Sequence, residues 1–446
     1  MSNFFENINS VHFVGVGGVS MSKLCMFTQK LGIKCSGSDS NNSDNIRLLK
    51  FYNIPITIGE DIIRAKNADL VVYSSAIPSD SRELMVAKRK IERKEYLKYV
   101  SNLFSSMIAI SGTHGKTTTS SMLSWIFKCS GEKFTAHIGG EIVGTNFMSL
   151  SSGYDTLITE ACEYKKSFLE LSPTLAVILN VDFDHPDCYK DINDVNLAFS
   201  IFAKKSKKVI YNNECESLDK LLKLSDKKAI SYGILNADYT LGEVSQNGNN
   251  INFEVLRYGK SLGVFTIYSY NPIYVMCALA VVATCLEYGI NINDIRIGLA
   301  TFPGVKERFE CLGRMKCGAR VIRDYAHHPK EIMTVINAGR NLVGDKLITV
   351  FMPHTYSRTK ALFDDFVQVL KSSDTVIILP TYKAREIAVD GVDSIELYDR
   401  LCKVMDNVVY AGSVLDAKEW INKNADMKTN VLAIGAGLNV DIFIEK

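Results

Sequence analysis

The chain has 446 residues, of which 47% are hydrophobic and 22% are charged, and its formal net charge is +2. Such a length is too great for one ordinary domain and suits roughly two to four domains, each able to bury a core. A net charge this close to zero gives no electrostatic reason to expect nucleic acid or an anionic membrane as a partner, and we expect neither.

The N-terminal sequence and the cysteine pattern favour the reducing cytoplasm. The first residues, MSNFFENINSVHF, contain no basic segment followed by an apolar one, so no secretory signal is predicted. The eleven cysteines form no CxxC pair of the kind that binds zinc. The best membrane candidate, residues 273–286, is shorter than the ~20 apolar residues of a spanning helix and is predicted to be a buried core helix.

The first predicted element is a strand at 11–16, which breaks at the glycines 15, 17 and 18 and is followed by a helical pattern through residue 31. Strand, glycine turn and helix open a βαβ unit, and a second apolar run at 69–74 extends a parallel sheet. We end this first domain near residue 101. Asp39 follows the glycines by about twenty residues, where an acid can bind the ribose of a dinucleotide or of a UDP-sugar. This domain alone therefore leaves a dehydrogenase and a nucleotide-sugar enzyme open.

A second domain, 102–303, begins with a predicted strand at 107–110 that leads directly into SGTHGKTTT and a helical pattern. In that context backbone N–H groups can cradle phosphates, Lys116 can reach the β and γ phosphates, and the Thr117 hydroxyl can bind Mg²⁺. The spacing departs from the common loop because Ile110 occupies the position of its first glycine. The alternative is a tight turn with an exposed lysine. A hydride-transfer enzyme has no use for such a loop, so it argues against a dehydrogenase. The predicted ATP-binding residues of the loop are Gly112, Thr113, His114, Gly115, Lys116, Thr117 and Thr118.

Candidate metal ligands follow the next two predicted strands, 156–159 and 175–179. Glu160 comes directly after the first, and Asn180, Asp182 and His185 follow the second. Ligands of open α/β sheets bind at the carboxyl ends of the strands, so these side chains are expected near Lys116. One or two carboxylates with substrate phosphates suffice for Mg²⁺, and a histidine is an unusual addition. The alternative for His185 is a turn residue before a proline.

A third domain, 304–446, contains predicted strands at 321–323, 347–351 and 375–379. The first two run into DYAHHP at 324–329 and PHTYSR at 353–358. Arg358 could grip a carboxylate or phosphate through two hydrogen bonds, and the histidines could orient an amino acid. The alternative is that they are surface turns. His12, His114 and His137 are expected to serve the structure more than the chemistry.

Ten motifs, in order along nearly the whole chain, resemble those of the Mur ligases, especially the members that join L-alanine to UDP-N-acetylmuramic acid. They are HFVGVGGVSMS, SGSD, SSAIP, SGTHGKTTT, EACEYKKSFL, NVDFDHPD, FPGVKERFE, DYAHHPKEI, PHTYSRT and YKAREI. The resemblance implies three tandem α/β domains: an N-terminal Rossmann-like domain for the UDP-sugar, a central ATPase domain, and a C-terminal Rossmann-like domain for the amino acid. It also implies a reaction in peptidoglycan precursor synthesis. The lactyl carboxylate attacks the γ-phosphate of ATP, and the alanine amine then displaces phosphate from the acyl phosphate.

The resemblance also assigns site residues. For the UDP-sugar these are Gly15, Gly17, Gly18, Ser38, Asp39, Ser74 and Ser75. For magnesium they are Thr117, Glu160 and His185, and for ATP, beyond the loop, Asn271, Arg308 and Asp324. The expected catalytic residues are Lys116, His185, Arg308, His328, His354 and Arg358, of which His328, His354 and Arg358 would address alanine and the muramyl carboxylate.

Some positions depart from the family pattern and keep two further readings open. Tyr270, Tyr274 and Arg323 stand where the family usually has histidine, asparagine and aspartate, which leaves a non-catalytic UDP-sugar-binding paralogue as an alternative. The second alternative is a ligase that recycles a whole tripeptide. Such a ligase usually carries a proline-rich segment after SGSD, where this chain has SNNSDNIRLL. Related ligases carry a carbamylated lysine at a position near Ser200, and the resemblance places no lysine at that position here, so none is expected. A cytoplasmic monomer or homodimer is expected.

Overall fold

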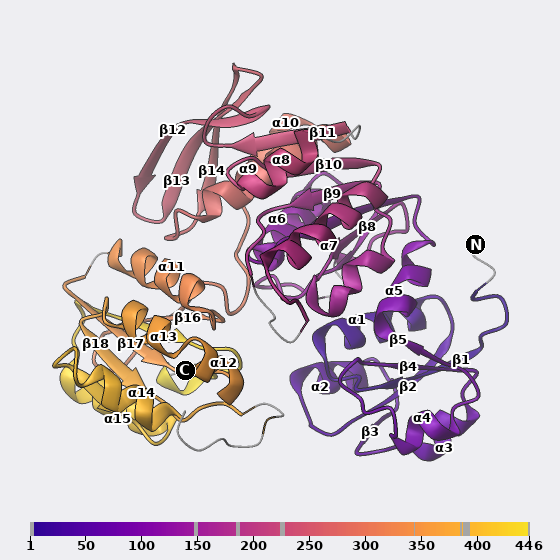
Figure 1. Ribbon diagram of the computed structural model, residues 1–446, viewed down its shortest axis with the longest axis horizontal. Helices are drawn as coiled ribbons and strands as arrows, with labels where there is room; N and C mark the ends of the chain where they lie inside the picture. Colours follow the sequence, from indigo (N-terminus) through magenta and orange to yellow (C-terminus); the bar gives the residue numbers. More distant parts are fainter. Residues whose placement is uncertain are drawn as a thin grey trace. The chain divides into compact units, whose positions relative to one another are not determined.

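The computed structural model describes residues 4–146, 150–183, 188–223, 228–342, 344–383, 386 and 393–444. They form three β-sheets with helices packed on them, as predicted for a tandem α/β protein (Figure 1). The chain divides into two compact units. The first comprises Met1–Gly242, Val255–Gly263 and Cys277–Leu299, and the second comprises the rest. The domain boundaries near residues 101 and 303 remain predictions. In the described part of the chain, every helix is too short or too polar to cross a membrane.

The N-terminal sheet has the strand order β3-β2-β1-β4-β5, and all its pairs are parallel. Phe13 and Val72 pack on one face with residues of α1 and α5, and Val14 and Val71 pack on the other with α3 and α4. The two predicted strands are therefore β1 and β4, side by side. The elements are β1 (Ser10–Val14), α1 (Val19–Lys30), β2 (Lys34–Asp39), α2 (Asp44–Phe51), β3 (Ile56–Ile58), α3 (Ile62–Asn67), β4 (Leu70–Tyr73), α4 (Arg82–Val86), β5 (Lys90–Glu92) and α5 (Arg93–Ser101).

The central sheet has the order β14-β13-β12-β11-β10-β9-β6-β8-β7. Strand β6, which precedes the GKT loop, lies between β8 and β9 and is parallel to both, so their ends flank that loop. The elements before residue 225 are β6 (Ser106–Ser111), α6 (Lys116–Cys129), β7 (Phe134–His137), β8 (Thr156–Glu160), η2 (Tyr164–Glu170), β9 (Leu175–Ile178), α7 (Ile192–Lys205), β10 (Lys208–Asn212) and α8 (Glu216–Lys223). They are followed by β11 (Lys228–Gly233), β12 (Tyr239–Asn247), β13 (Asn250–Arg257), β14 (Lys260–Tyr268), α9 (Tyr274–Tyr288) and α10 (Ile292–Ala300). The predicted core helix at 273–286 is α9, whose residues 278–283 are buried.

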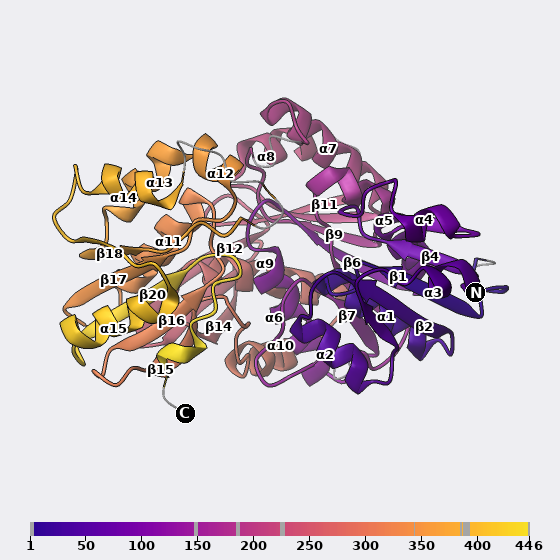
Figure 2. The same cartoon turned by 90° about the horizontal axis from the view of Figure 1, so that it is seen from below.

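The C-terminal sheet has the order β15-β16-β20-β17-β18-β19. Its pairs are parallel except for the edge strand β15, which runs antiparallel to β16. Leu347 and Phe351 pack with α11, α13 and α14, and the alternate residues Ile348 and Val350 pack with α15 on the opposite face (Figure 2). The elements are β15 (Glu310–Arg314), β16 (Arg320–Asp324), α11 (Pro329–Arg340), β17 (Lys346–Phe351), α12 (Tyr356–Ala361), α13 (Phe363–Leu370), β18 (Thr375–Ile378), α14 (Ser394–Leu401), β19 (Val408–Tyr410), α15 (Val414–Asn424), β20 (Thr429–Ile434) and η3 (Asp441–Phe443).

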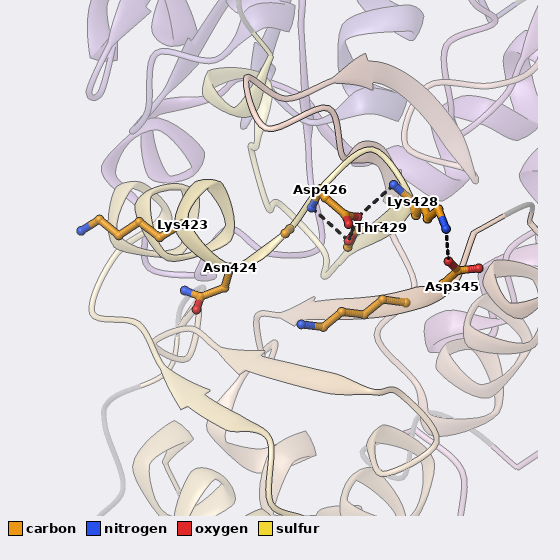
Figure 3. A pocket seen from close by; sticks show the side chains of 8 residues that line it. Asp345, Lys423, Asn424, Asp426, Lys428 and Thr429 are labelled. Carbon is orange, nitrogen blue, oxygen red and sulfur yellow. Dashed lines mark hydrogen bonds and ion pairs between the residues drawn. The ribbon is translucent and has the colours of Figure 1, made fainter.

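A hollow of about 270 Å³ lies at the amino ends of β17 and β20 (Figure 3). Lys428 Nζ lies 3.0 Å from Asp345 Oδ2, and Thr429 Oγ1 donates to Asp426 Oδ1 at 3.0 Å, so these polar groups satisfy one another. Ligands of open α/β sheets bind at the carboxyl ends of the strands, and this hollow lies at the opposite, amino ends. This hollow therefore lies away from the strand ends where a functional site is expected.

The buried carboxylate of Glu287, on α9, forms hydrogen bonds to strands of the central sheet, and we expect its removal to lower the stability of the protein. Glu287 accepts hydrogen bonds from Lys208 Nζ, from Tyr239 Oη at 2.8 Å and from Arg257 at 2.7 Å, and its side chain is 8% exposed. Burial alone would raise the pKa of Glu287, but these partners outweigh it and the pKa is lowered. The stability from this carboxylate is therefore present above the ordinary pKa of glutamate and is lost as the pH falls through the lowered value.

We expect Glu287→Ala to lower the free energy of unfolding by about 1.5 to 3 kcal/mol, because it removes the hydrogen bonds that Tyr239 and the partly exposed Lys208 and Arg257 donate to this carboxylate. Urea unfolding followed by circular dichroism measures this. Glu170→Ala is the control, since Glu170 pairs with Lys98 at 3.2 Å near the surface and its loss should cost less than about 1 kcal/mol. Equal losses in the two variants would show that the Glu287 network contributes little.

Candidate active site

The loop between β6 and α6 has the backbone that a phosphate-binding turn needs. Gly112 and Gly115 have φ of 142° and 84°, a region that favours glycine. A Cβ at Gly112 would lie 3.0 Å from Leu179 Cβ and 3.1 Å from the Asn180 nitrogen, so the loop passes close to the end of β9. Helix α6 begins directly after Gly115, and its first N–H groups have no partners within the helix. A helix start of this kind favours an anion.

Asn180, at the end of β9, holds the same loop in shape. Its Oδ1 accepts from the His114 nitrogen at 2.8 Å, and its Nδ2 donates to the His114 carbonyl at 3.0 Å. Thr113 Oγ1 accepts from the Asp182 nitrogen at 2.9 Å. Thr113 and His114 are therefore anchored through these bonds to the strand end beside the loop.

Lys116 is paired with a carboxylate to which the sequence analysis gave no role. Its Nζ lies 2.9 Å from Glu163 Oε2 and 3.2 Å from Oε1, and it also donates to the Thr113 carbonyl at 3.1 Å. Burial alone would lower the pKa of Lys116, but the charge of Glu163 outweighs it and the pKa is raised. The lysine is therefore a cation at neutral pH. The signal was the second glutamate of EACEY, three residues after Glu160.

Glu160, the last residue of β8, accepts a hydrogen bond from Thr117, the other described residue that the sequence analysis proposed for magnesium. Thr117 Oγ1 donates to Glu160 Oε2 at 3.2 Å, Ser120 Oγ donates to Oε1 at 3.2 Å, and the Gly139 N–H also donates to Oε1. A carboxylate and a hydroxyl are the hard oxygen donors that Mg²⁺ prefers, so these two residues fit that ion. Among the residues that the structure describes, no three His, Cys, Asp or Glu side chains form a metal cluster. A magnesium ion bound by one or two carboxylates together with substrate phosphates and water does not require one. His185 lies outside the described residues.

The glycine turn after β1 is closed by Asp39. Asp39 Oδ2 accepts from the Gly17 nitrogen at 2.8 Å, and Oδ1 accepts from the Asn41 nitrogen at 3.1 Å. The Gly15 nitrogen donates to the Ser38 carbonyl at 2.9 Å, and Gly15 has φ of 78°. Asp39 thus holds the turn through its amides, and ribose binding by Asp39 stays a prediction.

The other residues assigned to the UDP-sugar lie beside this turn or after β4. Gly18 caps the start of α1 without a side chain, and Ser74 Oγ accepts from the Ala76 nitrogen at 3.4 Å. The Ser75 carbonyl accepts from Lys165 Nζ at 3.1 Å. These residues therefore gather at the carboxyl ends of β1 and β4.

Asp324 and Arg308 lie together in the second unit. Asp324 ends β16 and accepts from the Phe309 and Ala326 nitrogens, both at 2.7 Å. Burial raises the pKa of Asp324 to about 6, although the positive charge of Arg308 opposes this rise. The Arg308 guanidinium lies over the Tyr325 ring, 4.9 Å from its centre. Asn271 is also in this unit, buried, with its Oδ1 accepting from the Ile273 nitrogen at 3.1 Å.

His354 and Arg358 also lie together, at the carboxyl end of β17. Arg358 donates to His354 Nδ1 at 3.2 Å, and the His354 ring stacks on Tyr382 with the ring centres 5.6 Å apart. Burial lowers the pKa of His354 to about 4, with the charge of Arg358 adding to the effect. The imidazole is therefore neutral near pH 7. The cluster offers a cation, a neutral ring and an aromatic face.

The histidine beside His354 is His327, which was not among the assigned residues. The two ring centres are 5.9 Å apart. His328 instead caps α11, where its Nδ1 accepts from the Lys330 nitrogen at 3.3 Å in a capping box with Glu331. The DYAHHP motif could not separate the two roles, because the direction of each adjacent side chain depends on where the helix starts.

Three family descriptions match the chain in order: Mur ligase family, catalytic domain, at residues 10–106; Mur ligase middle domain at 110–283; and Mur ligase, glutamate ligase domain, at 307–437. A UDP-N-acetylmuramate--L-alanine ligase from Clostridium tetani is 37% identical over 98% of this chain and 97% of its own length. The enzyme of that name from Clostridium perfringens is 35% identical over 98% and 97%. The chain belongs to the Mur ligase family.

Solved structures of Mur ligases share the fold. The UDP-N-acetylmuramate-alanine ligase of Thermotoga maritima superposes with a TM-score of 0.83 at 24% identity over 96% of both chains. A murein peptide ligase from Psychrobacter arcticus has a TM-score of 0.70 at 21% identity, again over 96% of both chains. The predicted three-part α/β fold is thus confirmed as that of a Mur ligase.

The three departures from the Mur ligase pattern have structural partners in the second unit. The Arg320 guanidinium lies over Tyr270, 5.7 Å from the ring centre, and Tyr270 and Tyr274 pack against the hydrophobic core of the C-terminal sheet. Arg323 pairs with Glu310 at 2.9 Å and Asp441 at 3.0 Å. These substitutions therefore have local structural roles, which removes much of the reason to suspect a non-catalytic paralogue.

Proposed function

We propose that the protein is an ATP-dependent ligase that joins L-alanine to the lactyl carboxylate of UDP-N-acetylmuramic acid in peptidoglycan precursor synthesis. The observation that carries the proposal is the mostly buried, charged Lys116 of the GKT loop, which lies next to Thr117, the residue bonded to the Glu160 carboxylate. The chain is also related over 98% of its length to proteins named UDP-N-acetylmuramate--L-alanine ligase. The carboxylate oxygen attacks the γ-phosphorus and ADP leaves. The alanine nitrogen then attacks the acyl carbon, and phosphate leaves as the amide forms.

The residues of the first unit suit the phosphoryl transfer. We propose that Lys116 exchanges its bond to Glu163 for the β and γ phosphates, since a phosphate at the start of α6 offers it a stronger anionic partner. Thr117 and Glu160 would hold Mg²⁺, and His185 would help to hold a second ion. A bound magnesium would neutralise charge on the phosphates as it develops. The residues Gly15, Gly17, Gly18, Ser38, Asp39, Ser74 and Ser75 would bind the UDP-sugar.

The residues of the second unit suit an amino acid. We propose that Arg358 binds a carboxylate and that neutral His354 orients the alanine beside it, with His328 also addressing the substrates. Arg308, Asp324 and Asn271 would contact ATP. Phosphoryl transfer depends chiefly on position and charge neutralisation, and the Arg308 guanidinium would supply positive charge.

We expect His354→Ala and Arg358→Ala to raise the KM for alanine by about tenfold or more, because each removes a hydrogen bond to a charged or polar substrate group. The KM for ATP should change little. Steady-state kinetics with one substrate varied at a time measures both constants. Arg340→Ala is the control, because Arg340 pairs with Asp374 at 2.7 Å away from this cluster. A normal KM for alanine in both variants would remove them from the site.

The choice of alanine over a tripeptide rests on the names of the relatives and on the absence of a proline-rich segment after SGSD. The test is to incubate the protein with ATP, Mg²⁺ and UDP-N-acetylmuramic acid, and to add either L-alanine or L-alanyl-γ-D-glutamyl-meso-diaminopimelate. Phosphate release that requires the sugar nucleotide and alanine is expected. Release with the tripeptide alone would favour the recycling ligase, and none with either would favour a binding protein.

We place the reaction in the cytoplasm, because ATP and nucleotide-linked sugars are made and used there. We also propose that the protein acts as a monomer or a homodimer.

A further inference from the structure

Two side chains of helix α1 bond to the segment that follows β7. Lys23 Nζ donates to the carbonyls of Ile138 at 2.5 Å and Gly140 at 2.9 Å. One turn earlier, Ser20 Oγ lies 2.9 Å from His137 Nε2. Helix α1 is therefore bonded to residues on both sides of Gly139.

Residues 138–140, the segment after β7, also contact the carboxylate of Glu160. The Gly139 N–H donates to Glu160 Oε1, and a Cβ at Gly139 would come within 2.8 Å of Oε2. On the other side, His137 Nδ1 lies 3.1 Å from Thr159 Oγ1, and these two residues are paired in the sheet. The path of residues 138–140 thus decides where the Gly139 N–H points, and with it the orientation of the Glu160 carboxylate.

We propose that Lys23 is a positioning residue for Glu160: by holding the carbonyls on either side of Gly139, its ammonium keeps the Gly139 amide on the carboxylate. The inference rests on the proposed function, in which Glu160 binds magnesium. An ammonium has only donors, so Lys23 acts on the ion through Glu160 and not as a ligand. Loss of a group that orients a metal ligand in this way typically lowers the metal affinity by about tenfold to a hundredfold.

The charge of Lys23 and its hydrogen bonds predict opposite effects on metal binding. Glu160 interacts electrostatically with Lys23, so the ammonium is close enough to repel a cation at that carboxylate. If charge were its main contribution, removing the ammonium would strengthen metal binding. If positioning dominates, removing it weakens metal binding, so the direction of the change distinguishes the two.

The test is the binding of Mn²⁺ to the full-length protein in the presence of ADP, followed by electron paramagnetic resonance. We expect Lys23→Met to weaken Mn²⁺ binding by about tenfold to a hundredfold. Lys23→Arg should restore part of the affinity, because it keeps donors for the carbonyls. Lys30→Met is the matched control: Lys30 lies on the same helix and donates to the Ser151 carbonyl at 2.9 Å, and Mn²⁺ affinity should stay at the wild-type value. Lys23→Gln replaces Lys23→Met if the latter does not fold, with weaker binding again expected.

A second variant tests the same contact from the other side. Gly139→Ala leaves Lys23 in place but puts a methyl group against the Glu160 carboxylate, and should also weaken Mn²⁺ binding. Wild-type or tighter Mn²⁺ binding in either Lys23→Met or Gly139→Ala would overturn the inference. Failure of the proposed function would look different, because the wild-type protein itself would then bind no Mn²⁺ with ADP and release no alanine-dependent phosphate.

Discussion

Replacing Lys116 with alanine should lower the rate of ligation at least about a hundredfold, because removal of one preorganised group from a developing anion has effects of that size. Binding of UDP-N-acetylmuramic acid should be nearly unchanged. The reason is that Lys116 belongs to the loop after β6, while the residues proposed for the sugar nucleotide belong to β1, β2 and β4 and their loops. ADP formation in a coupled assay and titration calorimetry with the sugar nucleotide measure the two properties.

Lys128→Ala is the control for this variant. Lys128 is on the same helix, in its last turn, where it lies over the Trp125 ring at 5.0 Å from the centre. Its loss should leave both ligation and sugar-nucleotide binding close to wild type. If Lys116→Ala weakened sugar-nucleotide binding as much as ligation, the assignment of the two nucleotides to different sites would be wrong.

Replacing Glu160 with glutamine should produce the second large effect, through magnesium. The change keeps the shape of the side chain but removes the negative charge to which Thr117, Ser120 and the Gly139 N–H donate. We expect kcat/KM for ATP to fall about a hundredfold, because the magnesium ion loses a carboxylate ligand. The Mg²⁺ concentration that gives the half-maximal rate should rise for the same reason. Initial rates over a series of Mg²⁺ concentrations measure the effect.

Glu170→Gln serves as the carboxylate control, because Glu170 ends the short helix after Glu160 and pairs with Lys98 near the surface. It should keep the wild-type Mg²⁺ dependence. A Glu160→Gln variant with an unaltered Mg²⁺ requirement would remove Glu160 from the metal site, and the inference about Lys23 would then lose its basis.

The local part of this fold could be predicted from the sequence, because it rests on short-range patterns. Apolar runs that end in glycine or polar residues predicted β1, β4, β6 and β9 to within a residue or two. Strands β12, β13 and β14 were not predicted, although Ile251, Phe253 and Val255 alternate with polar residues as a half-buried strand requires. The antiparallel edge strand β15 was also missed, since strand direction depends on partners distant in the chain.

Contacts of the candidate site could be predicted where both residues follow strands that end at one edge of the sheet, and were missed where a residue lies in another helix or loop. The GKT loop and the meeting of Thr117 with Glu160 follow from parallel strands that end at one edge. The pairing of Lys116 with Glu163 joins residues 47 positions apart, and the bond from Lys23 to Ile138 spans 115. Glu163 lies in the segment between β8 and η2, and Lys23 lies on helix α1, so the order of strand ends does not place them and these partners required the tertiary structure.

The most direct test of the central claim follows the oxygen atoms of the lactyl carboxylate. UDP-N-acetylmuramic acid labelled with oxygen-18 in that group is incubated with the protein, ATP, Mg²⁺ and L-alanine, and the released phosphate is analysed by mass spectrometry. Attack of the carboxylate on the γ-phosphorus leaves one labelled oxygen on each phosphate released, and this is the expected result. Amide formation with unlabelled phosphate would contradict the account, because the carboxylate would then have been activated in another way.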